Sequence, residues 1–452
     1  MRYLLVFSFY ALSVLVSFSS RSIDSPFSYW VVFTSLLIQL ISVCNLFTRN
    51  NEFFSFYKFF YLFSLFFFGI APLIQYFNKT IIWFKRPLYE EEYIFTNIII
   101  IGIITLYGLL YNLFRFVKYR NISSALLIPS NLVLNFDVFK SKILVLISIF
   151  AFFIVFQSNN FSLLAMLIRG GDLIEELLAN TVTDESPTKW LIINNFIRPI
   201  SMISFLVYAI NLNRNKFVYF ILLILAIITC FPTAMPRFAA AALYIPFTLI
   251  IFPFLKKKYL FILTFIFGLL VIFPSLDLFR TFSSDGRITF KPDFEMFKQG
   301  HFDCYQNFSL ILNYDIVTYG KQLFGVLFFW IPRTFWTSKP IGSGSFLAEQ
   351  LDFSFSNVSA NYFAEGYINF GFIGIILFTI LISFFTAKAD NLFWKNFKHN
   401  FRSNFDLIYL ISLGFIFFIL RGDLLSSIAY FIGYLSALKL ILILVNFKSK
   451  NE

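Results

Sequence analysis

Residues 53–77 read FFSFYKFFYLFSLFFFGIAPLIQYF and contain a single charged residue, Lys58. A helix needs about 20 apolar residues to cross the hydrocarbon core of a membrane, so this stretch is long enough to span it. Similar apolar stretches recur along the whole chain and predict an all-α polytopic membrane protein of about 12 transmembrane helices. The predicted spans are residues 3–19, 27–47, 53–77, 93–114, 143–158, 190–210, 217–232, 238–255, 259–275, 366–387, 405–420 and 424–446.

The composition supports the same fold class. Of 452 residues, 59% are hydrophobic and 13% are charged, and 69 are phenylalanine. A soluble protein must cover its surface with polar and charged residues, whereas the same apolar side chains face lipid at no cost in a bilayer. The net charge of +12 comes from short basic clusters between apolar runs, a pattern that does not indicate nucleic acid binding. Three scattered cysteines predict no disulfide framework and no metal site.

The distribution of basic residues predicts that both termini are cytoplasmic. With that orientation the positive-inside rule is obeyed at almost every connection between spans. The predicted cytoplasmic residues are Arg49, Arg115, Lys118, Arg120, Lys140, Lys142, Arg214, Lys216, Lys256, Lys257, Lys258, Lys388, Lys395, Lys398, Arg402, Lys448 and Lys450. The opposite connections are neutral or acidic, and the one before the sixth span carries Asp172, Glu175, Glu176, Asp184 and Glu185.

Two segments on the outer side divide the chain into three parts. Residues 1–275 would hold nine spans, with short amphipathic helices at 159–189 on the membrane surface. Residues 276–365 would form a large external loop that carries the active site, since long loops in compact proteins are usually functional. Within it, residues 323–331 are apolar but too short to span, which suggests a re-entrant or interfacial element. Residues 366–452 would supply the last three spans and a cytoplasmic C-terminus.

Several cations are predicted to meet on the outer face. They are Arg198, Arg237, Arg280, Arg333, Lys339 and Arg421. A guanidinium group is a natural bidentate partner for phosphate, so this set indicates a phosphate-binding vestibule. The alternative for each arginine is simple anchoring to lipid headgroups.

Carboxylates near the same face could act as a general base. Asn361, Glu365 and Asn369 are spaced to share one face of the helix that enters the tenth span. Asp303 follows His301 in the external loop. Glu365 or Asp303 could take a proton from a sugar hydroxyl, and the alternative for Glu365 is an ion pair at the helix entry. The sequence has no P-loop and no dinucleotide or metalloprotease motif, so we expect no cofactor.

The motifs of the external loop resemble those of bacterial O-antigen polymerases of the Wzy type. They are Phe302-Asp-Cys-Tyr-Gln-Asn307, Tyr319-Gly320, Phe324-Gly325, Ile331-Pro-Arg-Thr-Phe-Trp336, Lys339-Pro340, Gly342-Ser-Gly344, Asn357-Val-Ser359, Glu365-Gly-Tyr-Ile-Asn-Phe-Gly371 and Arg421-Gly-Asp423. The similarity of motifs covers about a quarter of the chain. Thr337 stands where this family usually has proline.

The resemblance implies a metal-independent glycosyltransferase of the bacterial inner membrane. Its substrate would be an undecaprenyl-pyrophosphate-linked oligosaccharide, polymerised on the periplasmic face, and a chain-length regulator would be its protein partner. Arg237, Arg280, Arg421, Arg198 and Lys339 would bind pyrophosphate, while Glu365, Asp303 and Arg333 would be catalytic. Trp330, Trp336, Tyr367, Asn361 and Asn369 would contact sugar. The alternatives are a lipid-linked oligosaccharide flippase and an O-antigen ligase.

Overall fold

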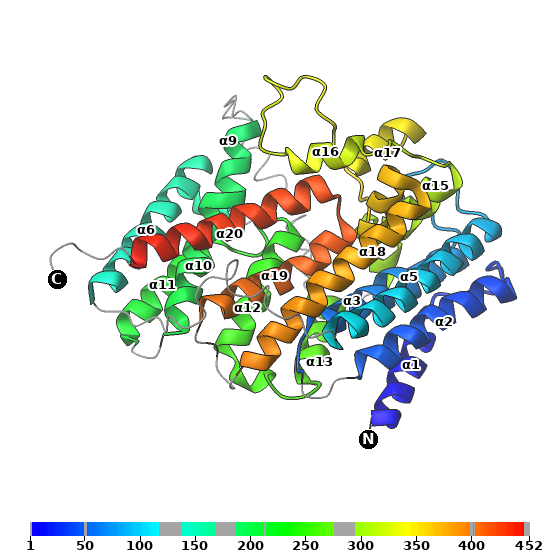
Figure 1. Cartoon of the computed structure of the whole chain (residues 1–452), viewed down its shortest axis with the longest axis horizontal. Coiled ribbons are helices and arrows are strands. Elements are labelled where there is room, and N and C mark those ends of the chain that lie inside the picture. Colours follow the sequence, from blue (N-terminus) through cyan, green and yellow to red (C-terminus); the bar gives the residue numbers. More distant parts are fainter. Residues whose placement is uncertain are drawn as a thin grey trace.

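The computed structural model is an assembly of α-helices, many of them long and roughly aligned (Figure 1). No β-strand occurs in the residues that the structure describes. These are residues 2–48, 52–116, 138–167, 187–211, 214–272, 274, 294–397, 401 and 403–446. Arg280, the acidic residues between 172 and 185, and the basic residues 49, 118, 120, 398, 402, 448 and 450 lie outside them, so the predictions on these residues are not tested.

Seven helices in the described part of the chain are long and apolar enough to cross a membrane. They are α2 (Tyr29–Leu46), the continuous run of α3 (Phe56–Phe63), η1 (Ser64–Ile70) and α4 (Ala71–Phe77), α5 (Glu90–Phe116), α6 (Val138–Ser158), α18 (Tyr362–Asn396), α19 (Asn404–Arg421) and α20 (Leu424–Asn446). The prediction of an all-helical chain with several helices of spanning length is therefore confirmed. The total of about 12 spans stays a prediction.

Shorter helices occupy the remaining predicted spans. They are α1 (Arg2–Phe18), α9 (Pro187–Ile192), η2 (Ile193–Ile197), α10 (Arg198–Ala209), α11 (Lys216–Thr229), α12 (Arg237–Ile251), α13 (Leu260–Phe267) and η4 (Gly268–Ile272). Of these, α1, α11, α12 and the pair α13–η4 are apolar along their length. A further short helix, α7 (Leu163–Leu167), follows α6.

The run Phe56–Phe77 is the central helix of the assembly. It is buried along its whole length, with α2, α18 and α19 packed against its first half. Ser55 begins the helix, because its side chain accepts a hydrogen bond from the Lys58 amide at 3.2 Å. Gly69 allows α2 to come close, since a Cβ there would lie 2.7 Å from the Gln39 Cγ. The quoted apolar stretch is thus the core of the fold.

The described part of the external segment folds into short helices. They are η5 (Glu295–Lys298), η6 (Gly300–Phe302), α15 (Cys304–Asn313), α16 (Lys321–Leu327) and α17 (Ser343–Leu351). The helix α15 is buried and contacts both α5 and α18. It is held by polar pairs, with Tyr305 donating to Asn97 at 2.8 Å and Thr96 donating to Ser309 at 2.9 Å. This segment therefore supplies part of the helical core as well as surface loops.

The helix α18 is broken near its beginning. Phe370 and Gly371 have non-helical backbone angles, and Gly371 has φ +60° and ψ −147°, a region that favours glycine. After this break the chain returns beside itself, because a Cβ on Gly374 would meet the Gly366 carbonyl oxygen. The predicted polar face of Asn361, Glu365 and Asn369 consequently lies on a short helix that ends before the long apolar part of α18.

Candidate functional site

Polar side chains from distant parts of the chain meet at the turn between α19 and α20. This turn is the Arg421-Gly-Asp423 triplet. We call its surroundings the Arg421 cluster, defined as Asp303, Ser343, Glu365, Arg421 and Asp423. The cluster joins the loop before α15, the first residue of α17, the short helix of α18 and the end of α19.

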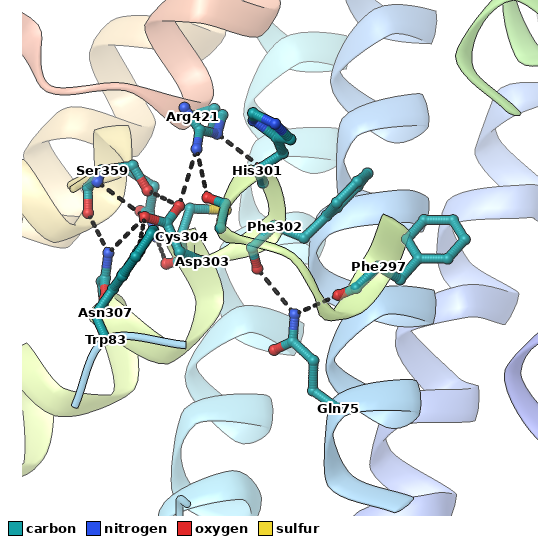
Figure 2. Close-up of polar contacts among 12 residues, drawn as sticks. Gln75, Trp83, Phe297, His301, Phe302, Asp303, Cys304, Asn307, Ser359 and Arg421 are labelled. Atoms are coloured by element: carbon teal, nitrogen blue, oxygen red, sulfur yellow. Dashed lines mark hydrogen bonds and ion pairs between the residues drawn. The ribbon is translucent and has the colours of Figure 1, made fainter. Parts of the chain in front are cut away.

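Asp303 lies at the bottom of this cluster and is 1% exposed. Its Oδ2 atom accepts from the Trp83 indole at 2.9 Å, the Asn307 amide at 3.2 Å and the Ser359 backbone at 3.1 Å (Figure 2). Its Oδ1 atom accepts from the Ser359 hydroxyl and from Arg421. Five donors fill the lone pairs of this carboxylate. Asp303 is therefore placed to organise the loop, with little capacity left to accept a proton from a substrate.

Arg421 ties the same loop to the end of α19. Its Nη2 donates to the Gly300 carbonyl at 2.9 Å and to Asp303 at 3.1 Å, and its Nε donates to the His301 carbonyl at 2.9 Å (Figure 2). The guanidinium also lies over the Phe238 ring, 4.8 Å from its centroid. No described residue accepts a hydrogen bond from the Arg421 Nη1 group. This half of the guanidinium can bind an anion while the other half holds the loop.

Glu365 is fully buried in the cluster and retains unused acceptor capacity. Its Oε2 accepts from the Ser343 hydroxyl at 2.7 Å, and its Oε1 accepts from the Leu424 amide at 2.8 Å. A carboxylate offers about four lone-pair positions, and the described residues fill two of them. Of the two predicted acids, Glu365 has the geometry that better suits a general base.

Asp423 faces the beginning of α17 from the α19–α20 turn. Its Oδ1 accepts from the Ser426 amide at 2.8 Å, in the first turn of α20. Its Oδ2 is so close to Gly342 that a Cβ there would lie 2.6 Å away. Burial raises the pKa of the Asp423 carboxyl above its usual range.

Two of the predicted arginines lie beside the cluster. Arg198 begins α10 and donates to the Ala234 carbonyl at 3.2 Å, in the turn that precedes Arg237. Arg237 begins α12, and the next residue is the Phe238 on which Arg421 lies. Arg198 and Arg237 are 5% and 7% exposed. Arg237 is therefore one residue from the ring that Arg421 contacts, and Arg198 is linked to the turn that precedes Arg237.

Arg333 and Lys339 occupy a different place. Both lie on the loop between α16 and α17, where Arg333 donates to the carbonyls of Lys339 and Pro340 at 2.7 and 3.1 Å. Lys339 donates to the carbonyls of Phe329 and Ile331 at 2.6 and 2.9 Å. Partial burial and the neighbouring Arg333 charge lower the pKa of the Lys339 ammonium. No contact of the described residues joins these two cations to the Arg421 cluster.

The residues predicted to contact sugar also fall into two groups, one buried on the short helix of α18 and one on the loop between α16 and α17. Asn361 is buried, where it caps α18 by accepting from Phe363 and Ala364 at 3.0 and 2.9 Å. Asn369 is buried and accepts from the Leu323 amide at 2.8 Å, and Tyr367 donates to Asp315 at 2.7 Å. These three side chains hold the backbone together. Trp330 and Trp336 lie on the α16–α17 loop, and Trp330 is largely exposed.

Five residues of the site were not predicted as site residues: Ser343 and Asp423 of the Arg421 cluster, and three further residues that bind Asp303. Trp83, Asn307 and Ser359 bind Asp303, and Trp83 is separated from it by 220 positions. Gln75, at the end of the central helix, donates to the carbonyls of Phe297 and Phe302 at 2.8 and 3.0 Å (Figure 2). Gln75 and Trp83 carry hydrogen-bonding groups at the end of an apolar run, and this position could have indicated a polar contact. No rule of sequence spacing links them to the loop.

The cluster can support chemistry that combines a buried carboxylate base with guanidinium groups. In the described residues, no three His, Cys, Asp or Glu side chains gather closely enough to hold a metal ion. Comparison of the chain with protein-family models, curated proteins and solved structures finds no match. The functional conclusion must therefore be drawn from the motifs and from this geometry.

Proposed function

We propose that the protein is a multi-pass membrane glycosyltransferase that polymerises lipid-linked oligosaccharide repeat units, as an O-antigen polymerase does. Its donor would be an undecaprenyl-pyrophosphate-linked glycan, and the reaction would take place on the outer face of the bacterial inner membrane. Both termini would be cytoplasmic, with about 12 spans and the segment 276–365 outside. A chain-length regulator is the protein partner that this function implies.

The observation that carries the proposal is the combination of cations and carboxylate at the α19–α20 turn. Arg421 lies at the turn over Phe238, the neighbour of Arg237, and Glu365 is bound to the Leu424 amide. Pyrophosphate needs several cationic donors, whereas glycosyl transfer needs a base for the acceptor hydroxyl. Glu365 and Arg421 belong to motifs that resemble the polymerase family, and Arg198 and Arg237 are the further cations proposed to bind the pyrophosphate.

The proposed step breaks the bond between the anomeric carbon of the donor and its phosphate oxygen. The acceptor hydroxyl oxygen forms the new glycosidic bond to that carbon, and its proton passes to the Glu365 carboxylate. Undecaprenyl pyrophosphate leaves with the bonding electron pair. Arg198, Arg237 and Arg421 stabilise the charge that develops on the leaving pyrophosphate. Arg280, which was predicted from the sequence, is kept in this proposed set.

In this proposal Asp303 is a positioning residue. It holds Arg421 at 3.1 Å and fixes the loop through Trp83, Asn307 and Ser359. Asn361 and Asn369 similarly hold the short helix that carries Glu365. Trp336 remains the proposed sugar contact, because an aromatic ring can stack on the apolar face of a sugar.

The experiment that tests this function is the lipopolysaccharide banding pattern of a strain from which the gene has been deleted. A polymerase predicts that the deletion leaves a core bearing one repeat unit and that the wild-type gene restores the ladder. The Arg237→Lys variant keeps the charge but loses the bidentate geometry, so we expect it to restore a shortened ladder or none. Its amount in the membrane is measured by immunoblot, so that a missing ladder is not mistaken for missing protein.

The matched control is Asp352→Asn, which changes an exposed carboxylate that pairs with Lys85 at the surface. We expect it to restore the full ladder. A core without any repeat unit in the deletion strain would point to a flippase or a ligase in place of a polymerase. A normal ladder in the deletion strain would reject the whole assignment.

A further inference from the structure

The helix α16 and the loop between α16 and α17 expose large apolar side chains. Phe335 is 86% exposed and Trp330 is 66% exposed, and Phe324, Leu327 and Phe328 are exposed as well. Figure 1 shows this segment leaving the helical assembly as an extended loop above α16. Surface loops normally present polar residues, so a contiguous apolar tip of this kind marks a surface that binds a partner or a membrane.

Part of the backbone of this loop is hydrogen-bonded within the loop itself. Arg333 donates to the carbonyls of Lys339 and Pro340, and Lys339 donates to those of Phe329 and Ile331. Each cation thus reaches across from its own arm of the loop to the other arm. Turns add further bonds, including Ile331 to Phe328 at 3.1 Å. Unpaired backbone groups are costly within the hydrocarbon, so this arrangement suits a loop whose backbone stays at the interface while its apolar side chains insert.

The charge of the segment has one sign. Between Asp315 and Glu349 the chain has no acidic residue, while Lys321, Arg333 and Lys339 are basic. Aromatic side chains and basic residues are the combination that favours the interface of a bilayer with anionic headgroups.

We propose that residues 324–335 insert into the interface of an anionic lipid bilayer, with the cations Arg333 and Lys339 at the level of the headgroup phosphates. Phe335 and Trp330 lie in the acyl region, and the crossed bonds of Arg333 and Lys339 keep the loop closed there. The loop thereby holds the α16 end of the assembly against the membrane surface. This role does not depend on which reaction the protein performs.

The test uses the full-length protein in lipid nanodiscs with a fluorescent probe on one cysteine. Cys44→Ser removes the half-buried native thiol, whereas Cys230 and Cys304 are buried. Phe335→Cys then carries an NBD fluorophore at the loop tip. The matched control is Asp352→Cys, whose native side chain is 88% exposed and pairs with Lys85 at the surface. Emission is recorded with doxyl-labelled lipid and with aqueous iodide, in phosphatidylcholine and in a mixture with phosphatidylglycerol.

We expect the probe at 335 to emit at shorter wavelength than the probe at 352, to be quenched by doxyl lipid and to be protected from iodide. Protection at 335 should increase when phosphatidylglycerol is present. Equal iodide quenching at the two positions would overturn the insertion. Protection that is the same in both lipids would overturn the anionic part of the proposal. Neither result depends on glycan synthesis, so failure here is distinct from failure of the proposed function.

Discussion

Two polar clusters lie at opposite ends of the same helices, and they differ in how their charges are paired. The Arg421 cluster lies at the end of α19. The second, which we call the Asp390 cluster, consists of Glu52, Lys58, Tyr111, Arg115, Asp390 and Tyr409, and Tyr409 lies near the beginning of α19. The central helix connects them, with Lys58 near its first residue and Gln75 near its last. At 1.5 Å per residue this helix is about 33 Å long, which matches the hydrocarbon thickness of a bilayer.

In the Asp390 cluster each charged group meets a complementary partner. Asp390 accepts from the amides of Phe56 and Tyr57 at 3.0 and 3.2 Å and from the hydroxyls of Tyr111 and Tyr409 at 2.6 and 2.5 Å. Arg115 forms an ion pair with Glu52, and the Lys58 ammonium donates to the Glu52 carbonyl. The Asp390 carboxylate, which lies on α18, thereby joins the beginning of the central helix to α5 and α19.

The Arg421 cluster is less completely paired. The carboxylates of Glu365 and Asp423 face the same turn, and neither forms an ion pair within the described residues. Fully satisfied networks of this kind stabilise one structure, whereas incompletely paired buried charges are typical of sites that bind or transform a ligand. The comparison therefore predicts a structural role for the Asp390 cluster and supports the chemistry proposed for the Arg421 cluster.

The largest expected effect on stability is that of Asp390→Ala. It leaves two tyrosine hydroxyls and two backbone amides buried without their acceptor, at about 1–3 kcal/mol for each group that finds no other partner. We expect the free energy of unfolding to fall by about 3 kcal/mol or more, measured by denaturation of the purified protein in detergent. The glycan yield for each folded molecule should be unchanged. A variant as stable as the wild type would remove the structural role assigned to this cluster.

The contrasting change is Glu365→Gln in the Arg421 cluster. The amide oxygen can still accept from the Leu424 amide, and Ser343 can accept from the new NH₂ group, so we expect stability to change by less than about 1 kcal/mol. Loss of the general base should lower the reaction rate at least about 100-fold, which is equivalent to about 2.7 kcal/mol of transition-state stabilisation. The measurement is the rate of chain extension from a purified lipid-linked repeat unit.

The control for Glu365→Gln is Glu365→Asp, which keeps the carboxylate on a shorter side chain. Partial recovery of the rate by this variant would support a carboxylate that takes a proton. If Glu365→Gln is as active as the wild type while its melting temperature falls, the residue is structural and the comparison between the two clusters fails.

The helical architecture was predictable because it depends on hydropathy, which can be summed along each stretch of the chain. The spanning length of the stretch 53–77 appears directly in its composition, and the structure places it at the centre of the assembly. Glu365 and Arg421 were predicted as site residues because a charge beside an apolar span usually has a defined partner, and the structure brings both to the α19–α20 turn.

The parts that were missed depend on pairing between distant residues. The hydrogen bonds from Trp83 and Ser359 to Asp303 produce no periodic pattern in the sequence. These bonds are the reason that Asp303 is assigned a role in organising the loop. The helix α15 is too polar to be predicted as buried, and it is buried because Tyr305 and Ser309 find partners on α5. No partner was predicted for Lys58 in its apolar span or for Asp390 just beyond the predicted tenth span, although such charges usually have a defined partner.

The smallest expected effect tests the backbone that carries the site. Gly371 has a positive φ that an alanine adopts only with strain, so we expect Gly371→Ala to lower the free energy of unfolding by about 1–2 kcal/mol. The same strain acts on Asn369, which binds the Leu323 amide, and hence on the short helix that holds Glu365. The chain-extension rate should therefore fall more than stability alone explains.

The matched control is Gly102→Ala in α5, where a Cβ meets no atom within 4 Å and the helix should be equally or more stable. Equal stability of both variants would mean that the break in α18 adapts to a side chain, and the position of Glu365 would then have to be set by Asn361 and Ser343 alone.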